Sequence, residues 1–149
     1  MRTTIRPARI HDVPEIIDLE RSVATAAHWT REQYESRLKD GCFLVAEAEG
    51  RVSAFVCSCV LASEWQIENI IVGERFRRRG LASALLSALI ETAERNGSSA
   101  LHLEVRESNL AARQLYMKQG FLPVGTRPNY YRDPPEDAIL YSRSTSTKP

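Results

Sequence analysis

The sequence has few cysteines, no long apolar run and no excess of charge of either sign. Its 149 residues include 20 Lys and Arg against 19 Asp and Glu, which leaves a net charge of +1. Binders of nucleic acid or of anionic membranes need a basic surface, so we expect neither partner. The longest uncharged stretch, at positions 52–63, is about 12 residues, whereas a membrane-spanning helix needs ~20. The N-terminus also lacks the apolar core of a signal peptide, and we therefore expect a soluble cytoplasmic protein.

The three cysteines, Cys42, Cys57 and Cys59, are an odd number, and two of them form a Cys-x-Cys pattern on an apparent strand. This usage predicts reduced, partly buried thiols rather than a disulfide framework. A structural zinc site needs about four well-spaced Cys or His ligands, and the sequence does not offer them. We therefore expect no metal and no catalytic cysteine.

Composition predicts one ordinary globular domain. Hydrophobic residues make up 43% of the chain and charged residues 26%, close to the average for soluble proteins. A chain of this length corresponds to a single domain with a sizeable core. The last residues are rich in Ser and Thr, so we expect the domain to cover residues 1–142 and a flexible polar tail to cover residues 143–149.

Hydrophobic periodicity predicts an α/β chain in which strands and helices are mixed. Asp12 with Glu15, and Thr30 with Gln33, have the spacing of capping boxes at the start of two helices. Further helices are expected at residues 80–96 and 109–119, the latter capped by Asn109. Strands are expected at residues 3–7, 42–46, 52–61, 64–72, 100–105, 121–125 and 137–141, with Gly50 in the turn of the first hairpin.

One arginine-rich turn joins a predicted strand to the long helix that begins near Gly80. The first turn of a helix has unpaired N–H groups and the positive end of the helix dipole, and a glycine lets a ligand approach the backbone. The turn is therefore a candidate cradle for a diphosphate, reinforced by three successive basic side chains, Arg77, Arg78 and Arg79. The alternative is a solvated basic turn that only caps the helix.

A second candidate site combines a strand and the helix that follows it. Alternation places Glu104 and Arg106 on the face opposite Leu103, and Tyr116 lies two helical turns after Asn109. A carboxylate on the strand and a phenol on the helix can then meet in one cleft. The alternative is a surface ion pair for Glu104 and a half-buried core position for Tyr116.

Six short segments are informative when they are taken together. They are Asn69-Ile70-Ile71-Val72, Arg78-Arg79-Gly80-Leu81, Leu103-Glu104-Val105-Arg106, Ser108-Asn109-Leu110-Ala111-Ala112, Leu115-Tyr116, and Arg127-Pro128-Asn129-Tyr130-Tyr131 followed by Glu136-Asp137-Ala138-Ile139. This set resembles the GCN5-related N-acetyltransferase (GNAT) superfamily, and within it the RimI type, and the resemblance covers residues 4–142. The resemblance implies a central mixed, mostly antiparallel twisted sheet of about seven strands with about four helices, splayed at strands 4 and 5.

The resemblance also implies roles for individual residues, with acetyl-CoA as the cosubstrate. Glu104 matches the family's proton acceptor and Tyr116 its proton donor. The expected cofactor-binding residues are Ile70, Ile71, Val72, Arg77, Arg78, Arg79, Gly80, Leu81, Ala82, Ser83 and Asn109. Positions that line the acceptor entrance in N-terminal acetyltransferases correspond to Trp29, Tyr130 and Tyr131. Ala82 replaces a frequent glycine, and Glu68 stands where the RimI type tends to carry an apolar residue.

The RimI type acetylates the N-terminal alanine of a small-subunit ribosomal protein. The resemblance therefore implies an acetyl-CoA-dependent transferase acting on a protein N-terminus, as a monomer or weak homodimer. An α-amino group has a pKa of ~7.7–8.0, so a carboxylate, either Glu104 or Glu68 through a water molecule, would have to deprotonate it before attack. The alternatives are acetylation of a small amine or a lysine side chain, and a non-catalytic acetyl-CoA-binding module.

Overall fold

The computed structural model describes residues 2–23 and 28–145, and its strands form one seven-stranded sheet. The order is β1-β2-β3-β4-β5-β7-β6. All neighbouring strands are antiparallel except β4 and β5, which are parallel. The strands are β1 (Thr3–Pro7), β2 (Gly41–Ala48), β3 (Arg51–Leu61), β4 (Glu64–Val72), β5 (Ala100–Arg106), β6 (Leu122–Arg132) and β7 (Pro135–Ser144). The predicted mixed, mostly antiparallel sheet is confirmed.

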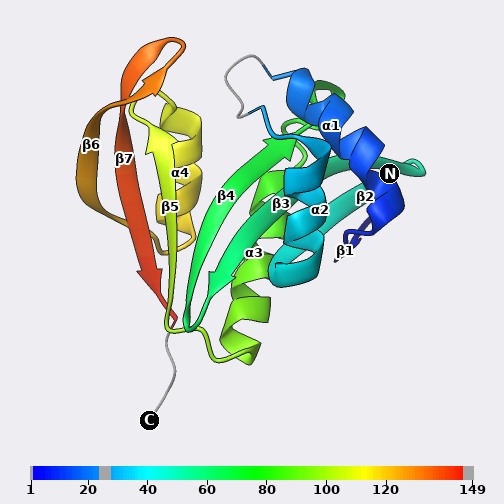
Figure 1. The fold of residues 1–149 in the computed structure, drawn as a ribbon, viewed down its shortest axis with the longest axis horizontal. Coiled ribbons are helices and arrows are strands. Elements are labelled where there is room, and N and C mark those ends of the chain that lie inside the picture. The colour runs from blue at the N-terminus through cyan, green and yellow to red at the C-terminus, as the bar shows by residue number, and fades with distance from the viewer. Residues whose placement is uncertain (1, 24–27, 146–149) are drawn as a thin grey trace.

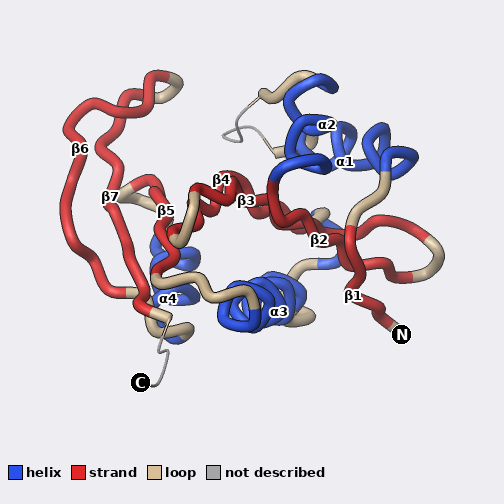
Figure 2. Tube along the Cα trace, turned by 60° about the horizontal axis from the view of Figure 1, so that its bottom comes forward, coloured by secondary structure: helices blue, strands red, loops and turns tan. Residues whose placement is uncertain are grey.

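Helices cover both faces of this sheet (Figure 2). The first pair, α1 (Val13–Arg21) and α2 (Arg31–Asp40), lies on one face, and the second pair, α3 (Leu81–Arg95) and α4 (Leu110–Lys118), lies on the other. Each face has its own core because each sheet face and each helix stripe must be buried. The rings of Tyr34, Phe43 and Phe55 fill the core under α1 and α2, and Leu85 and Leu89 of α3 lie in the larger core on the opposite face.

The two parallel strands at the centre of the sheet separate along their length (Figure 1). They pair only through Glu64–Ala100, Trp65–Leu101 and Gln66–His102. Beyond Gln66 the strands diverge, so β4 has no strand partner on its β5 side there. The splay that the sequence predicts at strands 4 and 5 is therefore confirmed, and it opens the sheet at the level of the candidate catalytic residues.

A β-bulge changes the alternation of side chains on β4. The register with β3 shifts so that Cys57 faces Asn69 while Ser58 faces Ile67, which leaves Glu68 as the extra residue. A bulge of this kind re-aims side chains next to a site. As a result, the consecutive side chains of Glu68 and Asn69 both contact residues of α2.

The two predicted capping boxes have different outcomes. Thr30 accepts a hydrogen bond from the Gln33 N–H at 3.2 Å, and the Gln33 side chain accepts one from the Thr30 N–H at 2.7 Å, as predicted. The prediction for Asp12 and Glu15 is wrong. The Asp12 carboxylate accepts bonds from the Arg9 N–H at 2.8 Å and from the Arg6 guanidinium at 2.9 Å, because Arg6 at the end of β1 offers a charged partner.

The last two strands are longer than the sequence pattern indicates. Prolines and a glycine interrupt the pattern of β6, and the pairing with β7 shifts register twice. An edge strand tolerates such residues because one side of its backbone needs no partner. Tyr130 and Tyr131 therefore lie within β6 rather than after it. β7 continues to Ser144, past the boundary predicted at residue 142, and residues 146–149 of the predicted tail lie outside the described residues.

Candidate active site

The first turn of α3 has an open backbone approach and unpaired N–H groups, the features of an anion-binding helix end. Gly80 precedes the helix with a left-handed φ of +75°, and nothing lies within 4 Å of the position that a Cβ would occupy. The helical ladder starts with the bond from the Ala84 N–H to the Gly80 carbonyl. The N–H groups of Leu81, Ala82 and Ser83 precede it, so they have no carbonyl partner inside the helix and point toward its positive dipole end.

A cavity of about 430 Å³ borders this helix end. Ten of the eleven predicted cofactor-binding residues line it, namely Ile70, Ile71, Val72, Arg77, Arg78, Gly80, Leu81, Ala82, Ser83 and Asn109. The eleventh, Arg79, is not among the lining residues, and its guanidinium lies 5.6 Å from the centre of the Phe76 ring. Ten of the eleven residues that we expect to bind the cofactor therefore lie around one cavity.

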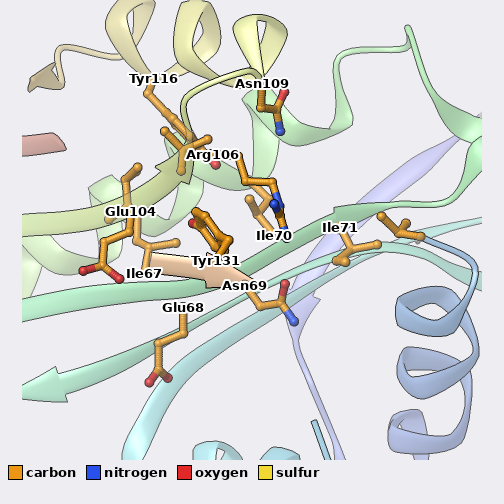
Figure 3. A pocket seen from close by; sticks show the side chains of 13 residues that line it. Ile67, Glu68, Asn69, Ile70, Ile71, Glu104, Arg106, Asn109, Tyr116 and Tyr131 are labelled. Carbon is orange, nitrogen blue, oxygen red and sulfur yellow. The ribbon is translucent and has the colours of Figure 1, made fainter. Parts of the chain in front are cut away.

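A second cavity of about 210 Å³ lies where β4 and β5 separate, and it shares Ile70, Asn109 and Tyr116 with the first. Two carboxylates, Glu68 from β4 and Glu104 from β5, line it from its two strands (Figure 3). The larger cavity can therefore hold a long cosubstrate while its reactive end reaches a space with two carboxylates and a phenol.

Glu104 is partly buried, with 19% of its side chain exposed. Its Oε2 lies 2.8 Å from Nε of Arg127, whose own side chain is 57% exposed. A hydrogen bond to this carboxylate is also the main reason that the pKa of the Tyr130 phenol is raised. Tyr130 thus contacts the predicted base without lining the cavity, whereas Tyr131 lines it.

Tyr116 projects from α4 toward the same cavity and is only 5% exposed. Its ring packs against Phe121 and Tyr141 with centroid distances of 6.0 and 6.2 Å. Burial raises the pKa of its phenol well above the ordinary value near 10, so the hydroxyl keeps its proton throughout the neutral range. The neutral phenol is therefore available as a hydrogen-bond donor rather than as a base.

Glu68 is held by an arginine of α2. Nε of Arg37 lies 2.5 Å from Oε1 of Glu68 and Nη2 lies 3.2 Å from Oε2, so both carboxylate oxygens are engaged. The same guanidinium lies 5.7 Å from the centre of the Trp29 ring. Trp29 lines neither cavity, and it packs on Tyr34 at 5.2 Å. It therefore supports the wall of the site rather than forming it.

Two polar residues of the smaller cavity, Asn69 and Arg106, were not among the predicted site residues. Asn69 donates a hydrogen bond to the Tyr34 hydroxyl at 3.0 Å. Arg106 stacks on the Tyr131 ring at 4.3 Å, and its Nε is the one buried side-chain nitrogen or oxygen without a hydrogen-bond partner in the described part of the chain. Arg106 shares the strand face of Glu104, so the alternation of β5 was a signal that could have found it. Asn69 had no comparable signal because of the bulge.

Among the residues that the structure describes, no histidine or cysteine lines either of these two cavities. His102 contacts Ser142 at 2.6 Å and Glu64 at 2.7 Å, so it joins the strands where they still pair and does not contact Glu104. Burial raises the pKa of the Cys42 thiol to about 11. Residues 2–23 and 28–145 contain no cluster of three or more His, Cys, Asp or Glu side chains that could hold a metal ion. None of the helices in these two ranges has the length and apolarity to span a membrane.

Comparison with known proteins decides the family. The sequence model of the acetyltransferase (GNAT) family matches residues 10–121. The chain belongs to this family. As a GNAT chain it is 35% identical over 140 residues, covering 92% of this chain and 94% of the relative, to the ribosomal protein bS18-alanine N-acetyltransferase of Escherichia coli. It is 33% identical over 151 aligned positions, covering 91% and 89%, to the N-alpha-acetyltransferase of Sulfurisphaera tokodaii.

The fold agrees with this assignment. The crystal structure of the Escherichia coli ribosomal-protein-alanine N-acetyltransferase matches with a TM-score of 0.91 at 32% identity, covering 99% of this chain and 97% of that one. GNAT acetyltransferases use acetyl-CoA, which supplies the thioester to be attacked. The open approach to Gly80 and the unpaired amides at the start of α3 fit its diphosphate, and the cavity along β4 and α4 fits an extended arm.

Proposed function

We propose that this GNAT acetyltransferase transfers an acetyl group from acetyl-CoA to the N-terminal α-amine of a protein, with alanine as the preferred first residue. Two observations support an N-terminal acceptor. The relatives named above carry N-terminal or alanine-directed activity in their names, and the acidic cavity between β4 and β5 suits a cationic amine. A ribosomal protein is the acceptor class that the Escherichia coli relative suggests.

Glu104 is the proposed general base. Near pH 7 most of an α-amine with a pKa of ~7.7–8.0 is protonated, so its attack on a thioester requires loss of a proton. Glu104 lines the cavity, where its carboxylate would receive that proton directly or through a water molecule. Glu68 has both oxygens engaged by Arg37 and is the weaker candidate.

The remaining steps use groups on the same cavity. When the neutral amine attacks the carbonyl carbon, negative charge develops on the carbonyl oxygen. Of the backbone N–H groups around Ile71 and Val72, those on the side of β4 that the diverging β5 leaves unpaired would stabilise this charge. The carbonyl then re-forms as the C–S bond breaks, the departing thiolate takes up the phenolic proton of Tyr116, and the extra proton on the attacking nitrogen restores the phenol. No covalent intermediate with the enzyme is needed.

The single observation that carries the proposal is the placement of Glu104 and Tyr116 on one cavity that continues into the diphosphate cradle. The test measures thiol release from acetyl-CoA with an alanine-starting peptide, and mass spectrometry locates the added acetyl group. We expect transfer to the α-amine that falls at least about 10-fold in Tyr116→Phe.

A panel of acceptors separates the alternatives. The same peptide with a blocked N-terminus and an internal lysine, free lysine and polyamines test the lysine and small-amine alternatives. Preferred turnover of any of these would contradict the proposed acceptor. Binding of acetyl-CoA without turnover on any amine would instead identify a non-catalytic binding module.

A further inference from the structure

A buried chain of hydrogen bonds runs from α1 to the wall of the smaller cavity. It starts at Glu20, which is 1% exposed and accepts bonds from the Trp29 N–H at 2.8 Å and from the Tyr34 hydroxyl at 2.6 Å. Tyr34 is fully buried, and its oxygen is also 3.0 Å from Nδ2 of Asn69. Asn69 lines the cavity, so the chain connects a buried carboxylate to the site.

The direction of each bond in this chain is fixed by counting protons. A phenol has one proton, and Tyr34 donates it to Glu20. The Tyr34 oxygen can therefore only accept from its other neighbour, and only the NH₂ end of the Asn69 amide can donate. The amide is thus held with Nδ2 toward Tyr34 and Oδ1 turned away. Figure 3 shows the two ends of this amide pointing in opposite directions, with the oxygen on the side of Ile70.

We propose that Asn69 is an acceptor-binding residue whose Oδ1 receives a hydrogen bond from the amine to be acetylated. Tyr34 and Glu20 are positioning residues that keep the amide in this orientation. The inference rests on the proposed function, and it assigns to this site a preference for a group that donates a hydrogen bond through N–H, such as an ammonium or an amine.

A neutral oxygen at this point has a chemical advantage over a further carboxylate. A carboxylate stabilises the ammonium form and raises its pKa, which opposes the deprotonation that attack requires. An amide oxygen orients the nitrogen of the acceptor amine by accepting a hydrogen bond from one of its N–H groups. It stabilises the ammonium form much less than a carboxylate does. Asn69 then aligns the amine, and the charged Glu104 on β5 remains to take the proton.

The orientation of the amide is the property that Tyr34 controls. Without the phenolic oxygen, the Asn69 amide can rotate by about 180° and present its NH₂ group to the cavity. Two donors would then face each other, and the acceptor amine would lose its hydrogen bond. The buried Glu20 acts one step further away, because it sets which way the Tyr34 proton points.

The first test replaces the amide by an apolar group of similar size, Asn69→Leu. We expect KM for an alanine-starting peptide to rise roughly 10- to 100-fold, with KM for acetyl-CoA changed less than about 2-fold. Calorimetric titration of the same peptide into protein saturated with CoA should show the same weakening without turnover. Asn69→Ala removes the amide without adding bulk and provides the same measurement if the leucine variant does not fold. Asn96→Leu, the same change at the end of α3, is the matched control.

The second test is a double-mutant cycle between Tyr34→Phe and Asn69→Leu. If Tyr34 acts by orienting the amide, Tyr34→Phe alone raises the peptide KM, and it adds little once the amide is gone. If Tyr34→Phe changes the peptide KM equally with and without the Asn69 amide, Tyr34 has a merely structural role. That result would overturn the proposal that Tyr34 positions Asn69.

The outcomes distinguish this inference from the proposed function. A wild-type enzyme that acetylates the peptide, with unchanged peptide KM and affinity in Asn69→Leu, overturns the assignment of Asn69 and leaves the proposed function intact. Peptide binding that depends on Asn69 but without acetyl transfer supports the acceptor site and refutes the proposed function.

Discussion

Replacing the proposed base by its neutral isostere, Glu104→Gln, should slow the reaction by an amount that depends on pH. Without a base the enzyme can use only acceptor molecules that are already neutral. For an α-amine with a pKa of ~7.7–8.0 this fraction is about 10–15% at pH 7 and above about 90% at pH 9. General-base catalysis contributes on the order of 100-fold or more. We therefore expect the Glu104→Gln variant to be about 100-fold slower than wild type at pH 7. At pH 9 this difference in rate should be about 6- to 10-fold smaller.

The assay follows thiol release from acetyl-CoA with an alanine-starting peptide between pH 6.5 and 9.5. Arg127→Met is the matched control, since it removes the cation beside Glu104 and keeps the carboxylate. Glu68→Gln tests the second carboxylate of the cavity. A Glu104→Gln loss that stays constant across this range, or the same pH-dependent loss in Glu68→Gln, would refute the assignment of the base.

Three further expectations follow from the same contacts. Ala82→Glu places a negative charge at the diphosphate cradle, so calorimetry should show acetyl-CoA binding weakened at least about 10-fold. Tyr34→Phe removes a bond to the buried Glu20, so the free energy of unfolding should fall by about 1.5–3 kcal/mol, or roughly 3–12 °C in Tm, while Tyr130→Phe should change little. The pKa of Tyr116 is raised on folding, so its contribution to stability is complete below the unfolded value near 10 and is lost as the pH rises further. Alkaline melts of wild type should decline more steeply than those of Tyr116→Phe.

Local sequence was sufficient to predict the helix start beside the larger cavity, and the family resemblance supplied the other residues that we expect to bind the cofactor. The strand, the turn and the first turn of α3 are consecutive in the chain, and a glycine at position 80 marks the place where the backbone must be open. Ten of the predicted residues therefore meet on one cavity. Arg79 is the exception, because a run of three arginines does not itself tell which side chain turns back over Phe76.

The acceptor side could not be predicted in the same way. Strict alternation along β4 places Glu68 and Asn69 on opposite faces of the sheet. The bulge at Glu68 breaks this alternation, and no pattern in the neighbouring sequence predicts the bulge. The partners of both residues come from α2, about 30 residues earlier in the chain. The capping prediction for Asp12 failed for a related reason, since its charged partner Arg6 belongs to a different element.

The two carboxylates of the cavity differ in the side chains that contact them, and this difference bears on the roles proposed for them. Arg37 binds both oxygens of Glu68, and only 21% of either side chain is exposed, so the two groups form a partly buried charge pair. Arg127 contacts one oxygen of Glu104 and is itself largely in water, where an ion pair contributes little. This difference supports the proposal that Glu104 rather than Glu68 takes the proton of the acceptor amine.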